Sequence, residues 1–141
     1  ELDLSKINAS EKICFDKEVE SLRKEVFHSE FSIINASCGV SSHGVVCVIS
    51  SKEQPRMLSL APTLCIILLK KEQIVRSMSE AFALVKKGGD KAKSSDTNAL
   101  NSNKTLPNNI LFIAGPSRTA DIELITVFGV HGSQKVHLVL Y

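Results

Sequence analysis

The sequence has little aromatic character and almost no net charge. Among its 141 residues there is no Trp and one Tyr, which excludes a platform of several aromatic side chains for stacking nucleic-acid bases. The 17 Lys and Arg against 15 Asp and Glu leave a formal charge of +2, which excludes a nucleic-acid binder that works by neutralising many phosphates. The hydrophobic content of 43% is nevertheless that of a globular protein, so disorder of the whole chain is excluded as well.

Long hydrophobic runs and closely spaced cysteines are also missing. The most apolar stretch, Met57–Leu69, is interrupted by polar residues and proline and falls short of the ~20 residues of a membrane span, so we expect a buried strand there. The four cysteines include no Cys-x-x-C pair, so neither a zinc nor an iron–sulfur motif is predicted. Cysteines inside apolar runs behave as small hydrophobes, and we expect a reduced, cytoplasmic protein without a membrane span.

Short apolar runs alternate with amphipathic stretches along the chain. The apolar runs predict strands at Lys12–Phe15, Phe31–Ile34, Val45–Ile49, Thr63–Leu69, Ile110–Ala114 and Val136–Leu140. Because Thr63–Leu69 has no polar alternation, we expect it to be buried on both faces. Apolar residues at helical spacing predict helices over Lys17–His28, with Asp16 as N-cap, and over Glu72–Lys87, stopped by Gly88–Gly89.

Two stretches lack such patterns. Asn35–His43 is small and polar, and we expect a loop. Gly88–Asn109 is expected to be a polar, mobile insertion. Strands separated by helices predict an α/β fold with a mixed, mostly parallel sheet and flanking helices, and antiparallel pairing is expected in the helix-free part from Phe31 to Leu69.

A segment beginning Gly115-Pro-Ser-Arg follows the strand Ile110–Ala114 at its carboxyl end, where α/β proteins place ligands. Gly115 and Pro116 predict a turn, after which Ser117 or Thr119 can cap a helix and leave backbone N–H groups free. The planar guanidinium of Arg118 would stand beside those groups and complete a small site for a carboxylate or phosphate. Asp121 and Glu123 would then lie in the first turn of the helix. Equally, Arg118 could pair with Asp121 and only fix the turn.

Two histidines beside glycines are further candidates. His131 lies in Gly129-Val-His-Gly132 and could act as an acid–base or hydrogen-bonding group, or bond only to backbone. In Ser41-Ser-His-Gly44, Gly44 could let the backbone approach a ligand beside His43; the alternative is a plain hairpin turn. The sequence contains no Gly-x-Ser-x-Gly elbow and no glycine-rich phosphate loop, so no catalytic residue is assigned.

The segments GPSRTADIEL and GVHG, followed by a terminal hydrophobic strand, resemble the LUD-domain family, and within it the group of lactate utilization C, or YkgG-like, proteins. The upstream stretch SLAPTLCIILLKKEQIV also resembles a family pattern, with Pro62 in register. Where the family usually has a turn similar to A-E-T-G-T, this chain has Ser41-Ser-His-Gly-Val, so the customary acidic residue is absent and His43 stands near its place.

The resemblance implies a fold like the NagB, RpiA and CoA-transferase group and a single domain over residues 1–141 that lacks a native N-terminal portion. It further implies an accessory, non-redox component of L-lactate oxidation to pyruvate, with no cofactor of its own and with cysteine-rich and iron–sulfur partner proteins. The alternatives are a stand-alone enzyme or binding protein for a phosphorylated or CoA-linked metabolite, and a purely structural module. The residues assigned to a ligand site are Gly115, Pro116, Ser117, Arg118, Thr119, Asp121, Glu123, His131, Gly132, His43 and Gly44.

Overall fold

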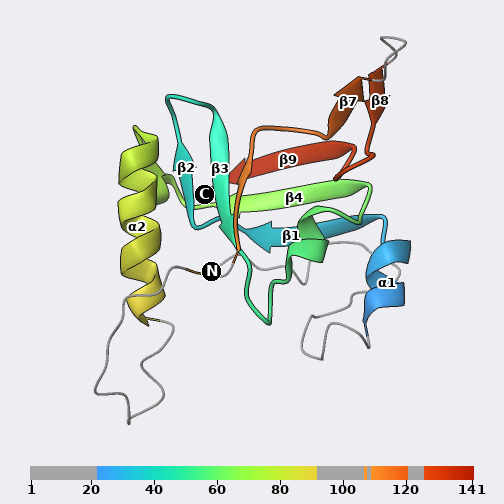
Figure 1. Cartoon of the computed structure of the whole chain (residues 1–141), viewed down its shortest axis with the longest axis horizontal. Coiled ribbons are helices and arrows are strands. Elements are labelled where there is room, and N and C mark those ends of the chain that lie inside the picture. Colours follow the sequence, from blue (N-terminus) through green and yellow to red (C-terminus); the bar gives the residue numbers. More distant parts are fainter. Residues whose placement is uncertain (1–21, 92–106, 108, 121–125) are drawn as a thin grey trace.

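Three parallel strands form the first sheet of the protein (Figure 1). The computed structural model describes residues 22–91, 107, 109–120 and 126–141. Within them, β1 (Phe31–Asn35), β4 (Leu64–Leu69) and β9 (Lys135–Leu140) lie in the order β1-β4-β9. All three were predicted from their apolar runs, and their parallel pairing places the carboxyl ends of the strands at one edge of the sheet.

A second sheet runs across the first and is mixed (Figure 1). Its order is β5 (Ile74–Val75), β2 (Cys38–Val40), β3 (Val45–Ile49) and β6 (Ile110–Ile113). The β2–β3 and β3–β6 pairs are antiparallel, and β2–β5 is parallel. The antiparallel pairing expected between Phe31 and Leu69 is confirmed. The loop expected over Asn35–His43 is wrong at β2, which is too short to show a pattern.

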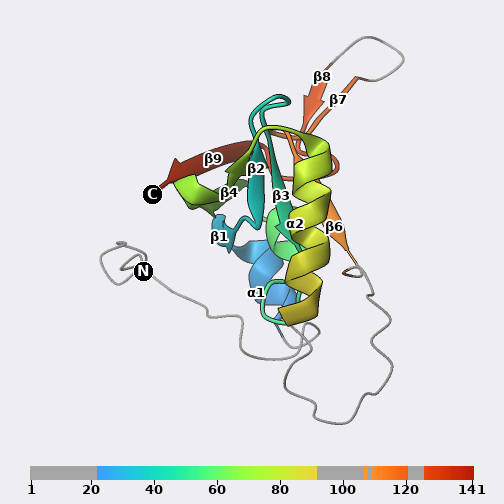
Figure 2. The ribbon, with the colours of Figure 1, turned by 90° about the vertical axis from the view of Figure 1, so that its left-hand side faces the viewer.

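Helices cover part of this framework. α2 (Met78–Lys91) runs along the second sheet, and Figure 2 shows it from the side, while α1 (Arg23–His28) precedes β1. The helix expected over Glu72–Lys87 begins later, because a 3₁₀ turn (Lys71–Gln73) and β5 occupy its first part. Gly88 and Gly89 do not stop the helix, which continues to Lys91. A glycine pair weakens a helix but need not end it when the preceding turns are held by packing.

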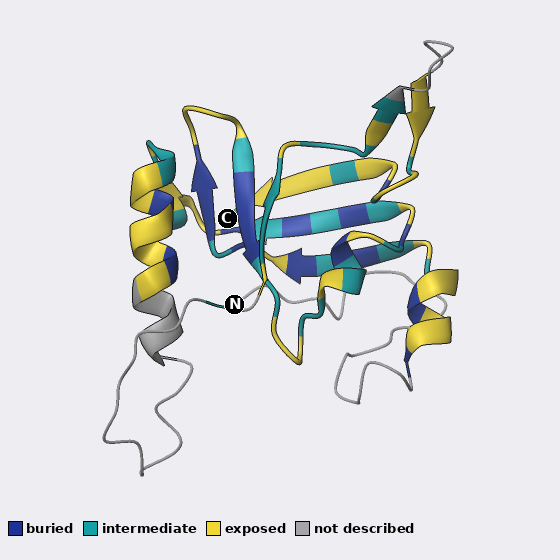
Figure 3. Cartoon of the chain, viewed as in Figure 1, coloured by how far each residue is buried: buried dark blue, intermediate teal, exposed yellow. Residues whose placement is uncertain are grey.

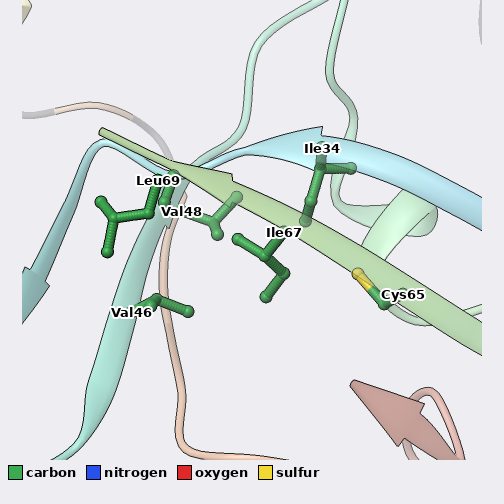
Figure 4. Close-up of a cluster of buried hydrophobic side chains, with 7 residues drawn as sticks. Ile34, Val46, Val48, Cys65, Ile67 and Leu69 are labelled. Carbon is green, nitrogen blue, oxygen red and sulfur yellow. The ribbon is translucent and has the colours of Figure 1, made fainter. Parts of the chain in front are cut away.

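The hydrophobic core lies in two layers, seen as the buried positions of Figure 3. Between the sheets, Ile34, Ile67 and Leu69 meet Val46 and Val48 (Figure 4). Between the second sheet and α2 are Cys38, Val40, Cys47, Ala81 and Val85. The cysteines at 38, 47 and 65 are buried free thiols, as expected of small hydrophobes.

Burial along β4 differs from the expectation. Cys65, Ile67 and Leu69 are buried against the second sheet, whereas the alternate residues are only half-buried. Thus one face of β4 carries most of the core, although both faces are apolar in sequence. The expected strand at Lys12–Phe15, the start of the helix after Asp16 and most of the Gly88–Asn109 segment lie outside the described residues. No helix among the described residues is long and apolar enough to span a membrane.

Candidate functional site

A pocket of about 250 Å³ lies where the end of β6 meets the parallel sheet. Its wall is formed by β6 and the turn that follows it, by the loop that leads into β9 and by the segment before β4. Its floor carries one residue each from β4 and β9. The lining residues are Ser59, Leu60, Cys65, Leu111, Phe112, Ile113, Ala114, Gly115, Ser117, His131, Gly132, Ser133 and Val136.

Ser117 connects the two segments that the sequence singled out. Its backbone N–H donates to the carbonyl of Ser133 at 2.9 Å, and its carbonyl accepts from the N–H of Gly129 at 3.1 Å. Its side-chain Oγ accepts a third bond, from the backbone N–H of His131 at 3.2 Å. Gly115, Ser117, His131 and Gly132 therefore lie in one site, although His131 is 14 positions from Ser117 in the sequence.

Two serines close the inner side of the pocket. The buried Ser133 hydroxyl donates to the carbonyl of Ser59 at 3.2 Å, and the Ser59 hydroxyl donates to the carbonyl of Arg56 at 2.8 Å. These bonds fix the 3₁₀ turn (Arg56–Ser59) against the loop before β9. Sequence reasoning did not identify Ser59, Leu60 or Ser133 as site residues, and the only signal near them was the family-like SLAP stretch.

The thiol of Cys65 lines the pocket but is not activated. Burial raises its pKa above the ordinary value, and a hydrogen bond with the Ser32 hydroxyl only partly offsets this. A thiol with a raised pKa stays protonated at neutral pH and is a poor nucleophile. Cys65 therefore serves as an apolar part of the floor, together with Val136.

Arg118 is not among the residues that line this pocket. Arg118–Ala120 is a strand, β7, paired antiparallel with β8 (Thr126–Phe128) in a small hairpin; the helix expected after Ser117 or Thr119 does not begin there. Arg118 is exposed and lies directly opposite Phe128 in the register of the two strands. Its guanidinium is 5.3 Å from the centroid of the Phe128 ring. The β-branched and aromatic residues of this segment favour such a ladder, and a cation–π contact supports it.

Pro116 and Thr119, which were also assigned to the site, are not among the residues that line the pocket. Pro116 follows Gly115 in the turn, and Thr119 lies in β7. Asp121 and Glu123 lie outside the described residues, as does the expected pairing of Asp121 with Arg118.

His43 and Gly44 lie at the exposed turn that joins β2 to β3. Gly44 has φ +60°, and the Nδ1 atom of His43 is 2.7 Å from Oγ of Ser42. Neither residue lines the pocket, so the structure does not bring His43 to His131 there. Within the part of the chain that is described, no three His, Cys, Asp or Glu side chains are grouped so that they could hold a metal ion.

The fold and the paired Gly-Pro-Ser-Arg and Gly-Val-His-Gly segments define a class: the chain belongs to the LUD domain family, whose model matches residues 3–141. Among its relatives are YkgG of Escherichia coli K12, 34% identical over 79% of this chain and 44% of that protein, and lactate utilization protein C of Bacillus subtilis 168, 31% identical over 89% and 47%. An uncharacterized protein of Neisseria meningitidis, NMB1437, is 30% identical over 89% and 48%. The chain spans about half the length of these relatives.

A solved structure has the same fold. The crystal structure of a DUF162 family protein from Deinococcus radiodurans matches with a TM-score of 0.54 and 16% identity, over 83% of this chain and 56% of that one. The family resemblance and the α/β fold class expected from the sequence are therefore confirmed.

Proposed function

We propose that the pocket at Ser117 and His131 binds a small organic carboxylate, and that the chain works as a non-redox component of L-lactate utilization beside cysteine-rich and iron–sulfur partner proteins. The observation that carries this proposal is the meeting of the two family-like segments at one pocket. The link to lactate comes from relatives named lactate utilization protein C.

The polar groups of the pocket are suited to a carboxylate. Because the Ser117 Oγ accepts the N–H of His131, the hydroxyl hydrogen of Ser117 is free to be donated to a ligand oxygen. His131 is a second lining residue, and its side chain is able to donate a hydrogen bond. None of the described residues that line the pocket is acidic, so these residues present no like charge to an anion.

The apolar groups and the size favour a short molecule. Leu60, Cys65 and Val136 add hydrocarbon and thiol surface to the lining. The volume of about 250 Å³ is below the ~300–1,000 Å³ of sites for drug-sized ligands. An acid of a few carbons, such as lactate or pyruvate, would satisfy the serine and histidine while covering the apolar floor.

Thermal unfolding with added ligands tests the binding part. A ligand at a hundred times its Kd stabilises the folded state by about 2.7 kcal/mol, so lactate or pyruvate should raise the Tm by several degrees. Ser117→Ala should abolish this rise, and the matched control Ser42→Ala, on the β2–β3 turn, should keep it. A rise with sugar phosphates or CoA esters alone would favour the alternative metabolite class, and no rise with any of them would refute a small-anion site.

The proposed role in lactate utilization and the proposed iron–sulfur partners have to be tested in cells. Growth on L-lactate should require this gene, and a tagged chain should retain iron–sulfur proteins in native pull-downs from such cells. Growth without the gene, or a pull-down free of iron–sulfur proteins, would contradict the assignment to lactate utilization even if the pocket binds a carboxylate.

A further inference from the structure

β9 is an edge strand with the sequence character of an interior one. Leu138, Val139 and Leu140 are 47%, 39% and 48% exposed, and because neighbouring residues of a strand point to opposite faces, apolar side chains are exposed on both faces. Figure 3 shows most of β9 in the colour of exposed residues. Within the described residues, β9 pairs only with β4, and its other edge is open. Edge strands are usually protected by proline, by charge or by a bulge. From Val136 to Leu140 there is no proline and no Lys, Arg, Asp or Glu, and the register with β4 is continuous.

The hydrogen-bonding direction of β9 can be assigned residue by residue. The N–H of Lys135 donates to the carbonyl of Thr63, which precedes β4. The N–H of Tyr141 donates to the carbonyl of Leu69, and its carbonyl accepts from the N–H of Lys71, which follows β4. Since a parallel ladder uses alternate residues on each side, the odd-numbered residues of β9 face β4. Val136, Leu138 and Leu140 therefore direct their N–H and carbonyl groups to the open edge.

We infer that β9 pairs with β9 of a second copy of this chain, antiparallel, about a twofold axis through Leu138. In this register Leu138 lies opposite its own copy and Val136 lies opposite Leu140. All outward N–H and carbonyl groups of these three residues then find partners, and the side chains that meet on that face are apolar. The other face pairs His137 with Val139.

Charge distinguishes this arrangement from a parallel one. Lys135 is the single permanently charged residue of β9. A parallel in-register pair would place two Lys135 side chains next to each other, whereas the antiparallel pair places each Lys135 opposite Tyr141. The resulting sheet would be continuous through two copies of β1-β4-β9, with both pockets on the same side, because Val136 of each copy faces that side.

Sedimentation equilibrium and amide exchange of the whole chain test this interface. The mass should approach twice the 15.4 kDa of one chain as concentration rises. Leu138→Lys would set two like charges opposite each other and should raise the dimer Kd by at least about tenfold. The matched control Val127→Lys alters a side chain on β8 that is 43% exposed and should leave the Kd unchanged.

Exchange of backbone amides reports on the edge without any substitution. The amides of His137 and Val139, which face β4, should be protected at every concentration. Those of Val136, Leu138 and Leu140 should gain protection only as the dimer forms. A monomer at about 1 mM would overturn the inference, as would a dimer that Leu138→Lys leaves intact. Protection of the outward amides in dilute monomer would show instead that another segment of the same chain covers β9.

Discussion

Two turns of this protein look alike in sequence and differ in structure. Ser41-Ser-His-Gly44 and Gly129-Val-His-Gly132 each place a histidine beside a glycine. The first is the exposed turn between β2 and β3, where the side chain of His43 forms a hydrogen bond with that of its neighbour Ser42. The second is bonded to Ser117 through both Gly129 and His131, and it lines the pocket.

Both turns are held by long-range backbone bonds, since the N–H groups of Ser41 and Ser42 donate to the carbonyls of Val75 and Arg76. The difference lies at the histidine itself and in the pocket beside it. The backbone N–H of His43 donates to Val40, three residues away in the adjoining strand, whereas that of His131 donates to the side chain of Ser117, 14 positions away at the pocket. Such a fixed backbone can position a side chain at a pocket, because less entropy remains to be lost on binding. Substitutions made in pairs, one in each turn, should expose this difference.

The largest contrast is expected between Gly129→Ala and Gly44→Ala. Both glycines have positive φ, +78° and +60°, where a Cβ costs about 1–2 kcal/mol. At Gly44 a Cβ would meet nothing within 4 Å, whereas at Gly129 it would collide with the side chain of Gln134. We expect losses in the free energy of unfolding of about 3 kcal/mol for Gly129→Ala and about 1 kcal/mol for Gly44→Ala, measured by urea denaturation.

The collision itself can be separated from the backbone cost. Combining Gly129→Ala with Gln134→Ala removes the obstructing side chain, and the double variant should recover about 1–2 kcal/mol. Equal losses for the two single glycine variants would show that the two turns are not distinguished by packing.

A smaller contrast is expected for the serines. The buried Ser133 hydroxyl bonds to the Ser59 carbonyl, so Ser133→Ala leaves that carbonyl without this donor and should cost about 1–2 kcal/mol. The exposed Ser42 hydroxyl bonds to the imidazole of its neighbour His43, and the backbone bond of Ser42 to Arg76 survives the substitution, so Ser42→Ala should change stability by less than about 0.5 kcal/mol. Chemical denaturation of both variants measures the difference, and a neutral Ser133→Ala would mean that the 3₁₀ turn is held without this bond.

The sequence predicted those parts of the molecule whose burial leaves a local pattern. The strands β1, β3, β4, β6 and β9 were predicted because each consists mainly of consecutive apolar residues, which indicate burial. β2 was missed, since three residues that include Gly39 are too few to show a period. The segment after Pro116 was expected to be helical, because Ser and Thr after a turn also suit helix caps, and only the pairing with Thr126–Phe128 makes it a strand.

The residues of the pocket, too, could be predicted only where they belong to a local sequence motif. Gly115, Ser117, His131 and Gly132 were proposed from short motifs, and the structure brings them together. Ser59 was not proposed, because its bond to Ser133 spans 74 residues and leaves no trace in local spacing. Arg118 was proposed for its charge, but its position is set by Phe128, its cross-strand partner.

The smallest contrast concerns the two histidines and depends on the proposed carboxylate site. Both imidazoles are exposed, so His131→Ala and His43→Ala should each change the free energy of unfolding by less than about 0.5 kcal/mol. Only His131 lines the pocket, and losing its imidazole should weaken pyruvate binding about fivefold, or about 1 kcal/mol. Titration calorimetry with pyruvate on both variants measures this difference. A similar loss of affinity for His43→Ala would place the ligand at the β2–β3 turn instead. An unchanged affinity for His131→Ala would leave the hydroxyl of Ser117 as the group that selects the ligand.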